Sequence, residues 1–515
     1  MAPLTAKMAR KKVAIIGSGV AGIGALWALN RTHHDVYMYE AADRLGGHTN
    51  TVEYKHGKHK VMVDTGFIVL NTATYPNFIA FLKAIKVPTV PTEMTFGVSR
   101  DQGLFEWAGT SLSAVFAQRK NIFSPRMWRM IFDIIRFNKF ALDLLKEESK
   151  SEEYVNGNGV NGAKHAQGQE TVGQYLEREG YSDAFRDDYL IPMTAAVWST
   201  SPDKCSLEFP AVTLVRFMWN HHLLSTVSSR PSWLTLEYGA QSYIDAVMKG
   251  FPPNHIFLST AVESLTNDDD GRVRVHLENG KSNVYDHVIV ATHGDQAHAL
   301  ILPEADLEER QILSGFQTSK NTAILHSDLS LMPRKREAWS SWNYITESSV
   351  TGSNVDQVCL TYNMNILQHI PESLFGNVLV TLNPLHLPDP DFVYGRYTYS
   401  HPLYNSEAIR SQSMLPRIQN TRGISYCGAW TKYGFHEDGF SSGIKVAQEH
   451  LGATLPFKFK DSTFSRGNKP VLRLRDVVLR LILVVMQLII EIIEKLFGVQ
   501  RTGRERLRTK IRKLL

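Results

Sequence analysis

The stretch KKVAIIGSGVAGIGALWALN, from Lys11 to Asn30, decides the fold class. Its four apolar residues 13–16 predict a buried strand, which runs directly into a turn that contains three glycines. The small and apolar residues 21–30 then predict a helix, and DVYMYE at 35–40 predicts a second strand. The chain therefore opens with a strand–helix–strand unit, which is typical of a parallel α/β sheet.

Gly17, Gly19 and Gly22 form the pattern GxGxxG between that strand and that helix. The first glycine permits the tight turn, the second lets the backbone approach a pyrophosphate, and the third lets the helix pack on the strand. The helix N-terminus offers free N–H groups to phosphates. Glu40, at the end of the second predicted strand, can accept hydrogen bonds from ribose hydroxyls. The pattern predicts a dinucleotide site for a cofactor without a 2′-phosphate.

Composition excludes several classes of protein. The 515 residues are 43% hydrophobic and 21% charged, which allows a large core. A net charge of +5 does not suggest a nucleic-acid-binding protein. Cys205, Cys359 and Cys427 lie far apart without CxxC spacing, so we expect no disulfide framework and no metal site. Such sparse cysteines fit a reducing compartment, and the basic N-terminus lacks the apolar core of a secretory signal.

Sequence elements of the nucleotide-domain type recur near residues 255–295 and 423–450. We therefore expect a discontinuous α/β domain formed by 1–75, 230–300 and 418–455. The residues between these segments differ in character and predict a substrate domain of the α+β type, formed by 76–229 and 301–417. It contains a polar loop rich in Gly and Asn at about 147–170, expected to be flexible. A tail of different composition occupies 456–515.

EAADRLGGHTNTV, which begins at Glu40, resembles the second signature of the glutathione-reductase-like flavoproteins, in the branch that holds monoamine oxidases and phytoene-type desaturases. Seven further motifs occur in order along the chain: DTGFIVLNTATYPNF, IPMTAAVWS, VIVATHGDQA, LHSDLSLMPR, WNY, TYNMN and CGAWTKYGFHEDGFSSG. Together, from Lys12 to Leu451, they resemble the amine-oxidase-like proteins known as predicted NAD/FAD-binding proteins. These often neighbour cyclopropane-fatty-acid-synthase-type lipid methyltransferases.

The resemblance implies a glutathione-reductase-like Rossmann domain that binds FAD non-covalently. The residues implied to hold the ADP half are Gly17, Gly19, Gly22, Glu40, Arg44, Gly46 and Gly47. Arg44 can neutralise the pyrophosphate, and the backbone of Val262 is placed near the adenine. In the motif that begins at Gly428, a helix starting near Gly439 is implied to direct N–H groups at the flavin ring. Relatives carry an acidic residue where this chain has Ala429, and Glu437 or Asp438 could replace it.

His436, Glu437 and Asp438 form the cluster most suggestive of catalysis. One of them could act as a general base or orient the substrate, or the acids could cap the following helix in a solvated loop. Lys320 falls near the position where amine oxidases place a lysine bonded to a water at flavin N5, although a surface lysine is the alternative. Cys427 lies inside a predicted strand, which argues against a covalent flavin.

Aromatic residues in the predicted substrate domain could line a substrate tunnel or belong to the core: Trp198, Trp342, Tyr344 and Tyr362.

The tail contains LRLILVVMQLIIEIIEKLFGVQ, from Leu479 to Gln500, and then a basic run. On a helix, the polar residues share one stripe: Asp476, Arg480, Gln487, Glu491 and Glu494. The remaining positions are mostly aliphatic, so the helix is amphipathic. The apolar stretch between Arg480 and Glu491 is shorter than the ~20 residues that span a bilayer. The tail therefore predicts a helix lying on an anionic membrane; the alternatives are a spanning anchor and a packing or homodimer contact.

These observations predict an FAD-dependent oxidoreductase at the cytoplasmic face of a membrane. Its substrate would be a lipid or another hydrophobic small molecule, and it would dehydrogenate or isomerise an acyl chain by hydride transfer to flavin. One alternative is a flavin amine oxidase that releases peroxide, in which Trp430 and Tyr433 could supply the aromatic pair. Another is a non-catalytic FAD-binding protein in lipid modification.

Overall fold

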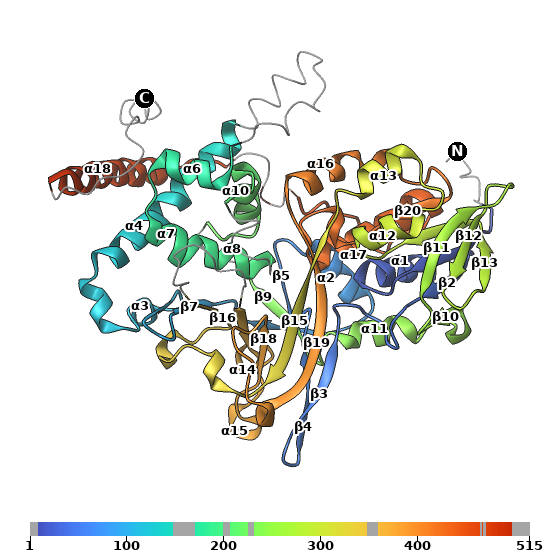
Figure 1. The fold of residues 1–515 in the computed structure, drawn as a ribbon, viewed down its shortest axis with the longest axis horizontal. Helices are drawn as coiled ribbons and strands as arrows, with labels where there is room; N and C mark the ends of the chain where they lie inside the picture. The colour runs from blue at the N-terminus through green and yellow to red at the C-terminus, as the bar shows by residue number, and fades with distance from the viewer. Residues whose placement is uncertain are drawn as a thin grey trace.

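The structure is a computed structural model that describes residues 9–147, 170–198, 207–224, 231–347, 359–463, 466 and 470–496. The flexible loop predicted at about 147–170 and the basic run after residue 500 lie almost wholly outside these ranges. Figure 1 shows the nucleotide-type sheet at one end of the longest axis and the C-terminal helix α18 (Leu474–Leu496) at the other.

A five-stranded parallel sheet is assembled from segments that lie far apart in the chain. Its strands, in spatial order, are β10 (Ile256–Phe257), β2 (Asp35–Tyr39), β1 (Lys12–Ile16), β14 (His287–Val290) and β20 (Ile424–Tyr426). Along β1, Val13 and Ile15 join one core and Ala14 and Ile16 join another. A parallel sheet buried on both faces requires apolar residues at successive positions, which explains the unbroken run in β1.

Helices cover one face of this sheet, and a small sheet with two helices covers the other. The first face carries α1 (Val20–Leu29), α2 (Pro76–Ala84), α11 (Gln241–Met248) and α17 (His436–Leu451). The second face carries the antiparallel strands β11 (Val262–Asn267), β12 (Val273–Leu277) and β13 (Ser282–Tyr285), together with α12 (Gly294–Ile301) and α13 (Leu307–Leu313).

Helices α1 and α17, from opposite ends of the chain, pack unusually close to each other. A Cβ on Gly443 would lie 2.0 Å from the carbonyl oxygen of Ala21, and one on Gly24 would lie 2.9 Å from the ring of Phe440. Such distances leave no room for a side chain. The glycines therefore set how near the two backbones approach.

The second sheet has seven strands and is antiparallel except between β16 and β7. Its order is β19 (Val393–Pro402), β15 (Thr318–His326), β18 (Leu379–Leu382), β17 (Cys359–Asn363), β16 (Trp342–Thr346), β7 (Phe96–Arg100) and β8 (Phe105–Ala108). Short helices follow its strands: α14 (Met364–Leu367), α15 (Glu372–Phe375) and α16 (Ser406–Met414).

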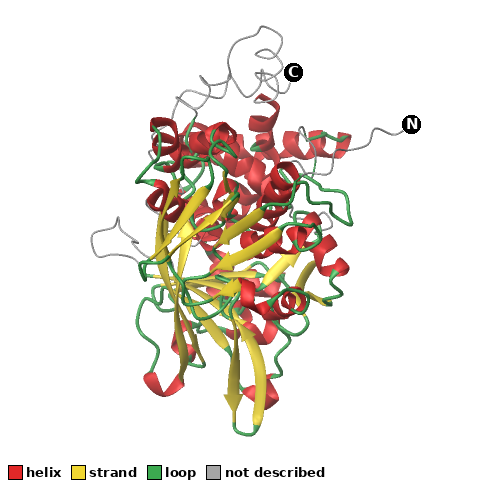
Figure 2. Cartoon of the chain, turned by 90° about the vertical axis from the view of Figure 1, so that its right-hand side faces the viewer, coloured by secondary structure: helices red, strands yellow, loops and turns green. Residues whose placement is uncertain are grey.

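A helical lobe with its own aromatic-rich core lies beyond this sheet. It contains α4 (Pro125–Phe140), α6 (Val172–Glu179), α7 (Asp183–Phe185), α8 (Ile191–Trp198) and α10 (Ala211–Asn220), whereas the short helix α3 (Leu112–Val115) follows β8 and packs on the core of the sheet. Figure 2 shows strands running through the middle of the molecule, with most helices above them.

Smaller strands complete the sheets. The strands β5 (Val69–Asn71), β9 (Trp233–Leu236) and β6 (Thr89–Thr92) form a three-stranded sheet, and the hairpin β3 (Thr51–His56) with β4 (His59–Asp64) projects from the body (Figures 1 and 2).

The α1–α17 contact leads to a test of stability. Replacing Gly443→Ala forces a methyl group against the Ala21 carbonyl oxygen, so we expect the free energy of unfolding to fall by about 1–3 kcal/mol. Urea unfolding followed by circular dichroism measures it. Gly250→Ala is the control, because a Cβ there meets its nearest atom, Asn30 Nδ2, at an ordinary 3.7 Å. Equal stability of the two variants would contradict this account of the packing.

Candidate functional site

The turn between β1 and α1 has the geometry that the glycine pattern predicts. Gly17 has φ +98°, a conformation that L side chains rarely adopt. A Cβ on Gly22 would lie 2.0 Å from the carbonyl oxygen of Gly17, so this position excludes any side chain. A Cβ on Gly19 would meet no atom of the described residues within 4 Å. Open space therefore lies in front of the N-terminus of α1, where a phosphate group would bind.

Glu40 connects the end of β2 to this turn. Its Oε2 accepts hydrogen bonds from the backbone N–H (2.8 Å) and the hydroxyl (2.5 Å) of Ser18, and its Oε1 accepts one from Ala42 N–H (2.9 Å). The Ser18 hydroxyl oxygen also accepts a bond from Gly46 N–H at 3.1 Å. The carboxylate therefore lies beside the glycine turn and holds it against the next loop. A carboxylate has about four acceptor positions, so capacity remains for a ligand hydroxyl.

The loop after Glu40 folds back onto the first glycine turn. Gly46 and Gly47 have φ values of +113° and +56°, and a Cβ on Gly47 would lie 3.3 Å from the Cα of Gly19. Arg44 donates to the carbonyl oxygens of Leu45, Thr49 and Gly47 at 3.4, 3.1 and 2.8 Å. In this structure its guanidinium braces the loop, while its positive charge stays beside the space in front of Gly19.

Val262 begins β11, which starts close to Glu40, the residue that follows β2. Thr260 N–H donates to the carbonyl oxygen of Glu40 at 2.9 Å, which brings the start of β11 to the end of β2. The tertiary structure thus places Val262 on the same side of the sheet edge as the two glycine loops.

The C-terminal motif reaches the same region through β20 and α17. Gly428 follows β20 with φ +157°, and its N–H donates to the hydroxyl of Ser442 at 2.9 Å. Gly439 faces α1, because a Cβ there would lie 2.6 Å from a methyl group of Val20. The N-terminus of α17 therefore begins beside the start of α1. Free N–H groups at that position favour negative charge on a ligand.

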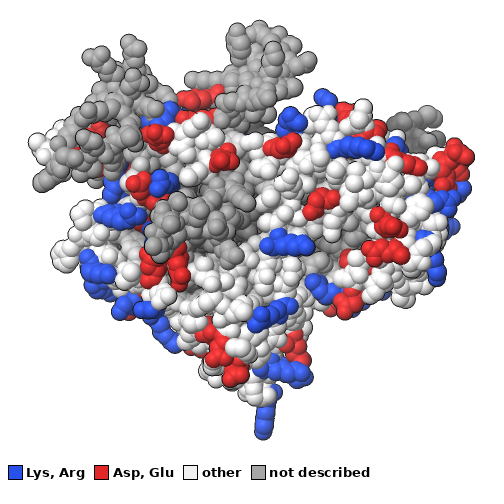
Figure 3. Space-filling model, in the orientation of Figure 1, with Lys and Arg blue, Asp and Glu red and all other residues white. Residues whose placement is uncertain are grey.

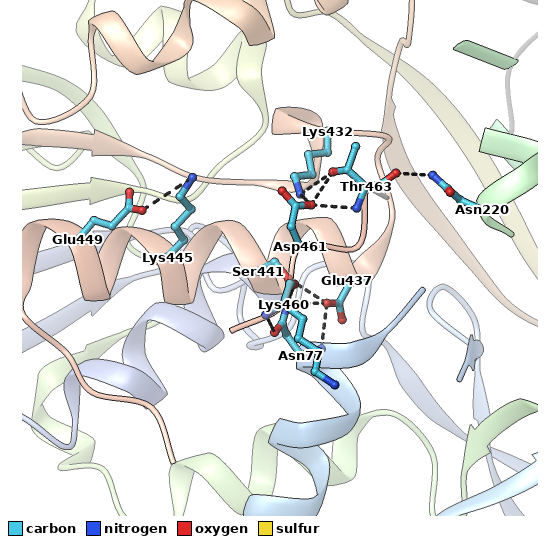
Figure 4. Close-up of polar contacts among 10 residues, drawn as sticks. All are labelled: Asn77, Asn220, Lys432, Glu437, Ser441, Lys445, Glu449, Lys460, Asp461 and Thr463. Carbon is cyan, nitrogen blue, oxygen red and sulfur yellow. Dashed lines mark hydrogen bonds and ion pairs between the residues drawn. The ribbon is translucent and has the colours of Figure 1, made fainter. Parts of the chain in front are cut away.

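Glu437 is buried and bonded entirely within the protein. Its carboxylate accepts from Asn77 N–H and Nδ2 at 3.0 and 2.9 Å and from Ser441 Oγ at 3.0 Å (Figure 4). It also accepts from Phe78 N–H at 2.9 Å. The two backbone donors are the free N–H groups at the start of α2. Burial raises the pKa of Glu437 to about 8, against the lowering effect of these donors. This geometry gives Glu437 a structural role, as a cap of α2, rather than the predicted catalytic one.

The two neighbours of Glu437 have different environments. Asp438 is buried, and its Oδ2 accepts from Phe435 N–H at 3.0 Å, which closes the first turn of α17. Burial raises the pKa of Asp438 to about 6. His436 stacks on Phe67 with ring centroids 3.6 Å apart, and its Nε2 lies 3.2 Å from the hydroxyl of Tyr243. Burial lowers the pKa of His436 to about 3, so its imidazole is neutral at physiological pH.

A group of histidines that the sequence analysis missed lies behind the second glycine loop. The ring of His48 lies 5.6 Å from that of His293 and 5.2 Å from that of His401. Desolvation lowers the pKa of all three, to about 4 for His401. Asn321 Nδ2 donates to His401 Nδ1 at 2.7 Å. Within the described residues, no group of His, Cys, Asp and Glu side chains is arranged to hold a metal ion.

His48 directly follows Gly46 and Gly47, and its Nε2 is buried without a hydrogen-bond partner among the described residues. A buried polar atom without a partner is rare and costly, which indicates a missing ligand group. His293 likewise lies in a loop, just after the end of the buried strand β14. Both histidines lie within motifs visible in the sequence, so their position directly after a glycine pair or a buried strand was the available signal.

Lys320 lies apart from this region. Alternate residues of a strand point to opposite faces, and Lys320 is exposed while Asn321, its neighbour in β15, is buried against His401. Ala323 and Leu325 lie on the same face of β15 as Asn321, and both belong to the core that also contains residues of α8. The predicted catalytic role of Lys320 therefore has no support from the geometry.

The predicted tunnel aromatics divide into two groups. Trp342 and Tyr362 are half-buried and meet edge-to-face at 5.2 Å, and the buried Nε1 of Trp342 has no partner among the described residues. Tyr344 is 2% exposed and belongs to the core. The side chain of Trp198 lies outside the part of the chain whose side chains are described.

Comparisons with known proteins agree with this geometry. A family model described as flavin-containing amine oxidoreductase matches residues 20–326. The 15-cis-phytoene desaturase of Arabidopsis thaliana is 23% identical over 312 residues, which cover 57% of this chain and 49% of the desaturase. The aligned region covers between a third and a half of the curated desaturases that the chain matches.

Two solved structures share the fold at 14% sequence identity each. The CLA-producing fatty acid isomerase from P. acnes has a TM-score of 0.58, with 85% of this chain and 98% of the isomerase covered. The cyclohexylamine oxidase from Brevibacterium oxydans has a TM-score of 0.59, with 86% and 100% covered. The mixed α/β fold is therefore that of the FAD-dependent amine oxidase-like structures.

The open space at Gly19 generates a prediction about cofactor binding. The variant Gly19→Val should fold, since Gly19 has φ −62° and a Cβ there meets no protein atom within 4 Å. Its side chain would fill the phosphate position, so we expect the bound flavin to be lost, with affinity at least about 100-fold weaker. Flavin absorbance per protein, with circular dichroism of the same sample, measures both properties. The control Gly109→Val, at an exposed glycine with nearest atoms 3.9–4.0 Å away, should remain yellow.

Retention of flavin by Gly19→Val at the level of the control would contradict the placement of the phosphate in front of α1.

The contacts of Glu437 generate a second prediction. The variant Glu437→Gln leaves a backbone donor of Asn77 or Phe78 without an acceptor, so we expect a loss of about 1–3 kcal/mol in unfolding free energy. We expect the rate of flavin reduction to stay within about threefold, because a structural cap does not act in the chemical step. Glu449→Gln is the control on the same helix, where the exposed Glu449 pairs with Lys445 at 3.8 Å (Figure 4).

Urea unfolding and stopped-flow reduction distinguish the two roles of Glu437. A stable but inactive Glu437→Gln variant would restore the catalytic assignment.

Proposed function

Because the chain belongs to the flavin-containing amine oxidoreductase family, it is an FAD-dependent oxidoreductase, and we propose that it dehydrogenates or isomerises a lipid acyl chain. The names of a phytoene desaturase and a fatty acid isomerase among the similar proteins favour a hydrophobic substrate whose C–H bonds react. The substrate class is the proposed part of this function.

We propose that the five-stranded sheet is a Rossmann-type FAD domain of the glutathione-reductase kind. The residues that would hold the ADP half are Gly17, Gly19, Gly22, Glu40, Arg44, Gly46, Gly47 and Val262, with Gly428 and Gly439 beside the flavin. The orphaned Nε2 of His48 and the open space at Gly19 fit such a group. Cys427 is fully buried in the core, and burial raises the pKa of its thiol, so it supports non-covalent binding.

The observation that carries the proposal is that, among the described residues around the start of α17, the imidazoles are neutral and both acids cap helices, Asp438 by accepting from Phe435 N–H. The four imidazoles of this region are His48, His293, His401 and His436, and burial holds the pKa of each below its ordinary value. Both oxygens of Glu437 are used to cap α2. A site whose imidazoles are neutral and whose acids are already bonded within the protein suits an uncharged acyl chain better than an ammonium ion, because an unpaired charge is costly to bury.

FAD, when bound, supplies the acceptor for two electrons from a C–H bond. The N-terminus of α17 favours the negative charge that develops on a reduced ligand beside it. Tyr243 holds the imidazole of His436 through its hydroxyl, and Phe67 holds it by stacking. The half-buried pair Trp342 and Tyr362 would serve as an aromatic wall for an acyl chain that reaches the seven-stranded sheet.

Amine oxidation is the second candidate, favoured by the fold shared with cyclohexylamine oxidase. It would use two aromatic rings that face each other across the amine, and the sequence offers Trp430 and Tyr433. In the structure, Trp430 is buried against Phe316 at 4.4 Å and donates to the carbonyl oxygen of Thr292, whereas Tyr433 contacts Tyr404 at 5.6 Å. The two rings have different neighbours, which favours the lipid substrate.

Anaerobic absorbance of the flavin bands tests the proposal. We expect bleaching with a total phospholipid extract and none with a panel of primary amines, because the acids at the start of α17 are already used to cap helices. Mass spectrometry of the acyl chains then detects a new or displaced double bond, which also reveals isomerisation without bleaching. Bleaching by amines with peroxide release in air would establish the amine oxidase instead. Unchanged acyl chains without any bleaching would reject both reactions.

A further inference from the structure

The C-terminal helix α18 binds the rest of the protein through its polar stripe. Arg480 is 7% exposed and donates to both carboxylate oxygens of Asp143, at 2.9 and 3.0 Å, and to the carbonyl oxygen of Lys139. The ammonium of Lys139 contacts Asp476 at 2.8 Å. At the other end of the helix, Glu494 lies 3.9 Å from the guanidinium of Arg129. The polar residues of α18 therefore face α4 and the turn after it.

The opposite face of α18 is aliphatic and exposed. Its side chains are between 39% and 81% exposed: Leu474, Val477, Val478, Leu481, Ile482, Val485, Met486, Ile489, Ile492, Ile493 and Leu496. They recur at intervals of three and four, so they form one continuous surface along the helix. This orientation is the reverse of an ordinary surface helix, which buries its apolar side. An exposed apolar surface of this extent marks an interaction site.

Both ends of this surface are basic. Arg473 and Arg475 are exposed at the start of the helix. After its end the sequence continues with Arg501, Arg504, Arg506, Arg508, Lys510, Arg512 and Lys513, against a single acid, Glu505. Figure 3 shows further Lys and Arg side chains along the edge of the molecule below α18, on the left in that view.

Ile122, Phe123 and Trp128 form an exposed apolar corner at the start of α4, where Trp128 Nε1 donates to the carbonyl oxygen of Ile122 at 2.7 Å. These residues are 40%, 86% and 51% exposed, and Trp128 directly precedes Arg129, the partner of Glu494. Tryptophan is enriched where a protein meets the headgroup region of a bilayer. The corner therefore adds an interfacial anchor to the aliphatic surface.

We propose that the outward face of α18 docks onto an anionic lipid bilayer, with the helix parallel to the membrane plane. Aliphatic side chains enter the boundary of the acyl chains, while the exposed Arg473 and Arg475 contact anionic headgroups. No helix of the described residues has the length and hydropathy to cross a membrane. The ion pairs to Asp143 and Lys139 fix the helix with its apolar side outward. This proposal does not depend on the reaction that the flavin performs.

A second copy of the chain fits this surface less well. In a parallel pair of α18 helices, Arg473 and Arg475 of one copy would lie beside the same residues of the other copy. Like charges brought together oppose association. Between Val477 and Ile493 the exposed residues of α18 are Val, Leu, Ile and Met, whereas strong protein–protein contacts rely on Trp, Tyr and Arg. Anionic lipid neutralises these arginines and accepts aliphatic side chains without specific pairing.

Sedimentation of the full-length protein with lipid vesicles tests the proposal. We expect the wild type to bind vesicles that contain phosphatidylserine, more weakly those of phosphatidylcholine alone, and more weakly at high salt because salt screens the basic residues. The double variant Ile482→Glu with Ile489→Glu places two carboxylates on the outward face, and we expect its partition onto phosphatidylserine vesicles to fall at least tenfold.

The control is the double variant Leu307→Glu with Leu387→Glu, which changes two leucines that are 86% and 66% exposed outside α18. It should bind vesicles like the wild type. Flavin content and the unfolding midpoint confirm that both variants fold. Undiminished binding by the Ile482→Glu/Ile489→Glu variant overturns the proposal. A second result would also overturn it: the wild type does not bind vesicles but forms a dimer in analytical ultracentrifugation, and the Ile482→Glu/Ile489→Glu variant is monomeric.

Discussion

The close contact between α1 and α17 is the constraint on which the rest of the site depends. Gly24, Gly439 and Gly443 let two helices from opposite ends of the chain approach until backbone meets backbone. Any side chain at these positions would force the helices apart. Because α1 follows the first glycine turn and α17 follows Gly428, this contact brings both motifs to one edge of the parallel sheet. The carboxyl ends of such strands are where open α/β sheets bind ligands.

The buried acids at the start of α17, Glu437 and Asp438, have structural rather than catalytic contacts. Glu437 supplies the acceptors that the first turn of α2 lacks, and Asp438 caps its own helix. These bonds tie α17 to α2, so the N-terminus of α17 is held in place by polar contacts as well as by glycine packing. Adjacent His, Glu and Asp residues in a glycine-rich stretch suggest catalysis. The hydrogen-bond partners of Glu437 and Asp438, however, give these two residues a structural role. The neutral His436 remains half-buried at the start of the helix.

Helix α18 packs on the protein through its polar side and exposes its apolar side, which is the reverse of an ordinary surface helix. Partly buried ion pairs with α4 hold it in a single orientation, and side chains that would ordinarily form a core are left exposed. Fixing the helix through its polar side leaves the apolar side available to an external apolar phase. The helical lobe and the nucleotide-type sheet lie at opposite ends of the longest axis, so a surface bound by α18 would meet the lobe rather than the sheet (Figure 1).

The sequence by itself determined the local elements and their chemistry. The apolar run of β1, the glycine pattern and Glu40 predicted the strand, the turn and the acid that the structure contains, because each depends on the backbone freedom or polarity of a few neighbouring residues. Periodicity likewise predicted the helix α18 and its polar stripe. Only the tertiary structure decided which residues meet across long distances. It assigned Glu437 to α2, placed Lys320 on an exposed face, gathered His48 with His293 and His401, and turned the apolar side of α18 outward. The periodicity of a sequence predicts that a helix has a polar and an apolar face. Which face is buried depends on the residues that pack against the helix, and these lie elsewhere in the chain.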